Sequence, residues 1–173
     1  MSFRLKSTAF CLIAGFLLSP IPLKAEDTSS SYKVLASQKT GYNLSTVRNL
    51  IKTGDELALK GDLVEARKTF DKARNVTKLL LGFYRDINGS FRGIDARIPR
   101  AMDSKGREGQ TLLAKTNLKL AALFRKQNEP EIAVPLLIEA LKLMTPTRPE
   151  GQQAYQSLLD LGFVETPYAG ARN

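Results

Sequence analysis

The segment 53–73 constrains the fold most, because small and large residues there surround a two-residue turn. Gly61 can adopt the left-handed backbone that ends a helix, and Asp62 can cap a helix that follows. Such a short turn predicts that the flanking helices fold back on each other as an antiparallel pair. Gly54 would let the two backbones approach closely, and Phe70 would fill the layer between them.

The apolar spacing predicts a first helical hairpin over about 45–84. The first helix, about 45–60, is expected to begin with Ser45 as its N-cap and to bury one apolar stripe. The second begins at Leu63 and is expected to continue past Lys78. The stripe of the first helix is formed by Val47, Leu50, Ile51 and Leu57. The inner face of the second carries Ala66, Phe70, Ala73 and the run 76–84.

A second, weaker copy of the arrangement follows over about 108–144. Pro130 suits the first turn of its second helix, whereas Pro135 lies inside that helix and should bend it or shift its start. A helix over 148–163 is expected to cap this pair, because a helical array must cover its last apolar face. The positions that match the first hairpin are Ala121, Phe124, Asn128, Glu129, Ala133, Leu137 and Ala140.

These two frames resemble the tetratricopeptide repeat (TPR), a helical hairpin with a period of about 34 residues. Ala73 and Ala140 lie 67 residues apart, close to twice that period. Two family features are missing, since Lys78 stands near the usual terminal proline and Leu50 replaces the usual early tryptophan. The resemblance implies an all-α fold of TPR-like helical hairpins, that is, a short α-solenoid with a C-terminal capping helix.

The chain is expected to be an exported protein. Arg4 and Lys6 precede an apolar run at 8–18, and Ala25 ends a segment typical of a cleaved signal peptide. The run is shorter than a membrane-spanning helix needs. The alternative to a cleaved signal peptide is an uncleaved N-terminal anchor. The compartment would be a periplasm or an equivalent lumen, such as a thylakoid lumen where the host has one, with membrane association left open.

The predicted domain plan has five parts. They are a signal peptide over 1–25, a flexible leader over 26–43, a TPR-like helical domain over 44–163 and a loose tail over 164–173, with an insert or degenerate repeat over 85–107 inside the domain. The insert is the least repeat-like part of the chain, so a specific function is expected there.

The composition argues against an enzyme. The chain contains no histidine, and its single cysteine, Cys11, lies in the predicted signal peptide, so triads and metal sites built on histidine are excluded. We expect no catalytic residue, cofactor or metal. A carboxylate-based hydrolase is the third and weakest alternative. Its candidate acids, which alternate with arginines, are Asp86, Asp95, Asp103 and Glu108.

One candidate partner surface follows from the resemblance. In the family, the first helices of successive repeats line the binding face. That face would hold Arg48, Lys52, Asp55 and Leu59 from the first hairpin and Lys115, Leu118, Lys119, Ala122, Arg125 and Lys126 from the second. So basic a set favours an acidic segment of another protein. The alternative is a solvated face without a ligand.

A second basic cluster lies in the insert and contains Arg92, Arg97 and Arg100, with Arg85, Lys105 and Arg107 nearby. Export disfavours nucleic acid as its partner, so an acidic protein or anionic lipid is expected, and the alternative is a surface offset by nearby aspartates. The net charge of +9 becomes +6 without the signal peptide.

The favoured function is a non-enzymatic protein-binding scaffold or assembly factor. The alternative is a basic peripheral factor at a membrane or cell envelope, with the oligomeric state open.

Overall fold

The computed structural model describes residues 41–171, and all its regular elements are helical within that range. The predicted signal peptide and most of the predicted leader lie outside the described residues. The elements are α1 (Leu44–Leu59), α2 (Leu63–Ser90), α3 (Arg97–Lys126), α4 (Pro130–Met144), α5 (Pro149–Asp160) and a short 3-10 helix (Ala169–Ala171). The predicted all-α class is therefore confirmed for this part of the chain.

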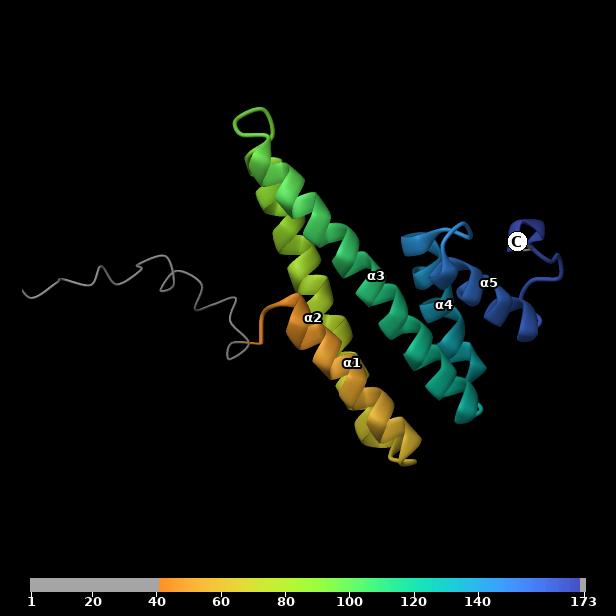
Figure 1. The fold of residues 1–173 in the computed structure, drawn as a ribbon. Coiled ribbons are helices and arrows are strands. Elements are labelled where there is room, and N and C mark those ends of the chain that lie inside the picture. Colours follow the sequence, from red (N-terminus) through yellow and green to blue (C-terminus); the bar gives the residue numbers. More distant parts are fainter. Residues whose placement is uncertain (1–40, 172–173) are drawn as a thin grey trace, which may run out of the picture.

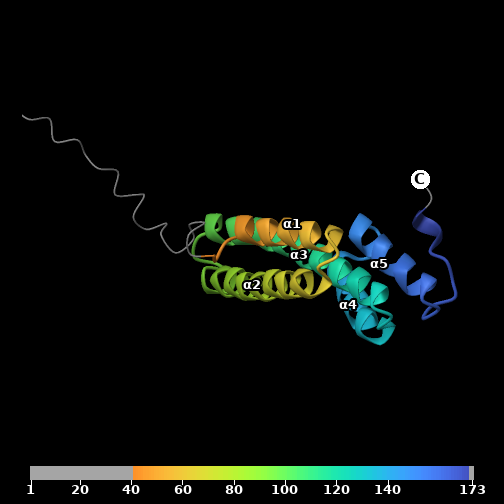
Figure 2. The ribbon, with the colours of Figure 1, turned by 90° about the horizontal axis from the view of Figure 1, so that it is seen from below.

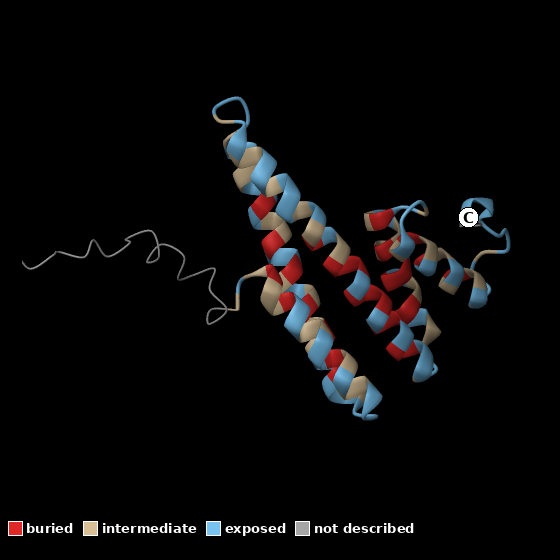
Figure 3. Ribbon diagram, in the orientation of Figure 1, coloured by how far each residue is buried: buried red, intermediate tan, exposed pale blue. Residues whose placement is uncertain are grey.

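The five α-helices form two layers. Helices α1, α3 and α5 lie in one layer, and α2 and α4 lie in the other (Figures 1 and 2). Buried residues gather where the layers meet, above all along the C-terminal half of α3 and on α4 (Figure 3). The core positions of the two predicted frames are buried apart from Leu57, which is half-buried, and the turn positions, which are not buried. The buried ones are Ala66, Phe70, Ala73, Ala121, Phe124, Ala133, Leu137 and Ala140.

The turn between α1 and α2 has the predicted chemistry. Gly61 has a φ of +84°, in the left-handed region that favours glycine. The Asp62 carboxylate accepts a hydrogen bond of 3.2 Å from the backbone N–H of Glu65. A Cβ added to Gly54 would lie 2.5 Å from Cε1 of Phe70, so the close approach predicted at that glycine is confirmed.

The N-cap of α1 differs from the prediction. Asn43, not Ser45, occupies the cap position, and its side-chain oxygen accepts a hydrogen bond of 2.7 Å from the backbone N–H of Thr46. The Ser45 hydroxyl donates to that same oxygen at 2.6 Å. Ser45 therefore supports the cap from inside the first turn.

The segment 85–107 is not a separate insert in the structure. Helix α2 continues to Ser90 and α3 already begins at Arg97, so the second hairpin starts earlier than the predicted 108. The two long helices project together past the start of α1 (Figure 1), and residues 85–107 are called the overhang below. Asn88 links its two helices, since its amide donates to the Pro99 carbonyl at 3.2 Å and to Asp103 Oδ1 at 2.6 Å.

The C-terminal part of the described chain consists of α4 and α5. Pro130 is the first residue of α4, and the helix runs unbroken through Pro135, so its start is not shifted. Helix α5 lies within the range 148–163 where a helix is predicted, is shorter than that range, and buries Ala154 and Leu158.

Part of the predicted tail contacts α5 and the core. The Tyr155 hydroxyl donates a hydrogen bond of 2.6 Å to the Thr166 carbonyl, and the rings of Tyr155 and Tyr168 meet edge to face. Val164 also packs against the main apolar core. Residues 164–168 thus add to the cover that α5 provides.

Candidate functional site

A groove runs between the three helices of one layer. Two adjoining hollows of about 350 and 530 Å³ share Asp55, Lys119 and Ala122. The smaller hollow extends toward the end of α1 at Leu59, and the larger reaches α5 at Glu150. We call this feature the α1–α3–α5 groove. Seven of the ten residues that the resemblance assigns to the binding face line it, while Arg48, Lys52 and Arg125 do not.

Most of the predicted cations of this face are already paired. Lys119 Nζ lies 3.0 Å from Asp55 Oδ1, and Lys115 Nζ lies 3.7 Å from Glu150 Oε1. The other pairs are Arg48 with Glu108, Lys52 with Glu56 at 3.9 Å and Arg125 with Asp160 at 4.0 Å. The face therefore carries mixed charge, unlike the predominantly basic face expected from the sequence.

The structure keeps the three predicted arginines of the overhang apart from that face. Arg92 lies in the loop after α2, and its guanidinium donates to Asn88 Oδ1 at 3.4 Å. The Arg97 guanidinium donates two hydrogen bonds, of 3.1 and 2.7 Å, to the Asp95 carboxylate. These bonds lower the pKa of Asp95 and raise that of Arg97. Arg100 forms no ion pair with a described residue.

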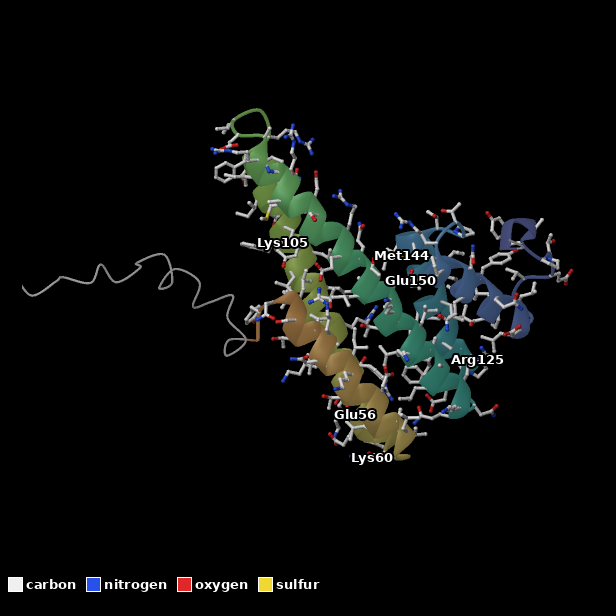
Figure 4. All side chains as sticks on the ribbon, in the orientation of Figure 1. Glu56, Lys60, Lys105, Arg125, Met144 and Glu150 are labelled. Atoms are coloured by element: carbon white, nitrogen blue, oxygen red, sulfur yellow. The ribbon has the colours of Figure 1, made fainter. Side chains whose placement is uncertain are left out.

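Sequence reasoning missed a second groove, which we call the basic groove. Two hollows of about 540 and 500 Å³ share Arg107, Gln110 and Leu143, where α2, α3 and the end of α4 come together. Lys78 and Arg148 also line it, although they lie far from each other in the sequence. Only the packing of α4 against α3 reveals this grouping. In Figure 4, Met144 marks the end of α4 beside the groove and Lys105 marks the overhang.

A polar network that includes Lys78 of this groove joins α2, α3 and α4. Arg74 donates to Asn117 Oδ1 at 2.9 Å and to Glu139 Oε2 at 2.5 Å, and Lys78 Nζ lies 2.9 Å from Glu139 Oε1. Burial acts to raise the pKa of Glu139, but the hydrogen bonds and charges of Arg74 and Lys78 outweigh it and lower that pKa.

The four acids considered for a hydrolase are engaged separately. Asp86 pairs with Arg85 at 3.3 Å, and Asp95 pairs with Arg97. Asp103 accepts from Asn88, and Glu108 pairs with Arg48. Within residues 41–171, no cluster of three or more His, Cys, Asp or Glu side chains is arranged to hold a metal ion.

Comparisons with family models, curated proteins and solved structures gave no match to this chain. Among the described helices, none combines the length and the apolar character that crossing a membrane requires.

Proposed function

We propose that this protein is a non-enzymatic scaffold of TPR-like type that holds an extended segment of another protein in the α1–α3–α5 groove. The observation that carries this proposal is the continuity of the two hollows, which run across three helices and share Asp55, Lys119 and Ala122. An extended segment can lie along such a groove and make contacts with each helix in turn.

The lining of the groove defines what the partner segment must offer. Ile51 and Leu118 provide apolar surface, and Leu59 at its end is 88% exposed. The Lys119–Asp55 and Lys115–Glu150 pairs expose both signs of charge. A partner with apolar side chains spaced between polar groups of either sign fits this lining better than a purely acidic one.

The place of action is part of the same proposal. The sequence of residues 1–25 supports export, so the partner would be met in a periplasm or an equivalent lumen. Cell fractionation tests the compartment separately from the binding site. Recovery of the protein in the cytoplasmic fraction would contradict this part of the proposal alone.

Site-specific photocrosslinking in cells that make the protein tests the groove. Ala122 is exposed and lines both hollows, whereas Ala101 is an exposed alanine of the same helix that lines neither. A photocrosslinking side chain at position 122 should give a discrete protein adduct, and the same side chain at position 101 should not. Equal adducts from both positions, or none from position 122, would contradict the proposed binding site.

A further inference from the structure

The basic groove gathers positive charge from four parts of the chain. Its cations are Lys78 and Arg85 on α2, Arg92 in the following loop, Arg107 on α3 and Arg148 before α5. Its carboxylates are Asp103 and Glu108. Lys78 pairs with Glu139 and Arg85 with Asp86, so the excess of positive charge in this groove comes from the other three cations.

The two carboxylates are already engaged by other side chains. Glu108 pairs with Arg48 on α1, and Asp103 accepts a hydrogen bond from Asn88. Arg92, Arg107 and Arg148 form no ion pair with any residue in 41–171. Three guanidinium groups along one recess attract a negatively charged ligand, because a recess with low-dielectric walls concentrates their field.

The shape and the apolar lining narrow the class of ligand. Leu81, Met102 and Leu143 line the same hollow as four of the cations. The groove extends through both hollows, which share Arg107 as their one common cation. A flat lipid surface would reach a recess poorly, and a single small anion would leave much of its length empty. An extended chain with acidic and apolar side chains would fill both hollows.

We infer that the basic groove binds an extended acidic segment of a partner protein, in which apolar residues alternate with carboxylates. Arg107 would bind at the centre, with Arg92 toward one end and Arg148 toward the other. This surface uses the N-terminal half of α3, so it is distinct from the α1–α3–α5 groove and does not depend on the function proposed for that groove.

Fluorescence anisotropy at low ionic strength tests the inference with a labelled peptide of alternating Glu and Leu. The matched control peptide has Gln in place of Glu. The test variant is Arg107→Gln, and Arg100→Gln is its matched control, because Arg100 is an unpaired arginine of the same helix that lines neither hollow. Arg107→Gln should weaken binding about tenfold through loss of a charge-assisted contact. Arg100→Gln should change binding by less than about twofold.

Arg92→Gln provides a second test at a loop position outside the helices, and it should also weaken binding while the thermal unfolding temperature stays unchanged. Equal losses in Arg100→Gln and Arg107→Gln would overturn the inference, as would equal binding of the Gln peptide. Two further probes separate other ligands. Displacement of the peptide by inorganic phosphate at matched ionic strength would assign the groove to a small anion and overturn the inference. Binding of phosphatidylserine vesicles that Arg107→Gln reduces and Arg100→Gln does not would assign the groove to a lipid headgroup and overturn it too.

Discussion

At the scale of single residues, Gly54 shows how one missing methyl group sets the packing of a hairpin. The ring of Phe70 occupies the space that a Cβ at position 54 would need, and Phe70 is 1% exposed. Gly54→Ala should therefore lower the free energy of unfolding by about 1–3 kcal/mol through overpacking, despite the better helix propensity of alanine. Urea unfolding measures this change.

Gly82→Ala is the matched control for that experiment. Gly82 lies inside α2, and an added Cβ there meets no atom within 4 Å. This substitution should raise the free energy of unfolding by about 0.5–1 kcal/mol, because alanine favours the helix. If both variants gained stability, the contact between Gly54 and Phe70 would not restrict the hairpin.

Individual residues were also where the sequence was most informative. The small and large core positions from Ala66 to Ala140 follow from helical periodicity, and the structure buries them. The first cap was harder to place, because Asn43 and Ser45 are both good N-cap residues. The choice depends on where the first turn begins, and neighbouring residues alone do not fix that position.

At the scale of elements, the seating of α5 depends on Gly151. A Cβ at this position would overlap the backbone of Thr145 and Pro146, which has little freedom to move. Gly151→Ala should therefore loosen α5 from the end of α4 while α1, α2 and α3 keep their packing. Hydrogen exchange followed by mass spectrometry should show faster exchange over 149–160 in this variant.

The same experiment contains its own control. Peptides from 63–84 of α2 should exchange as in the unmodified protein, since α2 packs mainly against α1 and α3. Faster exchange along the whole chain would mean instead that α5 and the preceding helices unfold as one unit.

The lengths of α2 and α3 could not be predicted from sequence. The Asn88–Gly89 pair is typical of a helix end, yet α2 continues to Ser90. Every residue of the overhang is half-buried or exposed, so its helices need no continuous apolar stripe for periodicity to reveal (Figure 3). Its helices are linked by the bonds of Asn88 to Pro99 and Asp103, and such contacts between helices are not visible in local periodicity.

At the scale of the whole molecule, Glu139 links three helices and makes stability depend on pH. Its pKa is lowered from its ordinary value of 4.5, so the carboxylate stabilises the fold above that value. This contribution should be lost as the pH falls through the lowered pKa. Glu139→Gln should reduce stability at neutral pH by about 1–3 kcal/mol, because Arg74 and Lys78 lose their partner.

Thermal unfolding measured from about pH 3 to about pH 7 checks this expectation, because that range includes the ordinary carboxyl pKa values. The gap between Glu139→Gln and the unmodified protein should narrow toward the acid end. Glu131→Gln is the matched control, since Glu131 lies exposed on the same helix and forms no ion pair with a described residue. A gap that stays constant with pH would show that Glu139 acts through packing alone.

The charge pattern of the whole molecule was the part least accessible to sequence. Lys119 and Asp55 lie on different helices, as do Lys115 and Glu150. Whether such cations are free or neutralised depends on which helices lie side by side. The same packing brings Arg107 and Arg148 to one groove. No sequence motif predicts that these two arginines lie together.

The unbroken course of α3 has a further consequence, because that one helix contributes to both grooves. Arg107 and Ala122 are separated by about 22 Å along its axis, at 1.5 Å per residue. The helix therefore fixes the distance between the two surfaces. A single partner chain engaging both would need a spacer of at least about seven extended residues between its two motifs. With that spacer, the second contact would form as an intramolecular step, and two weak motifs would give strong avidity.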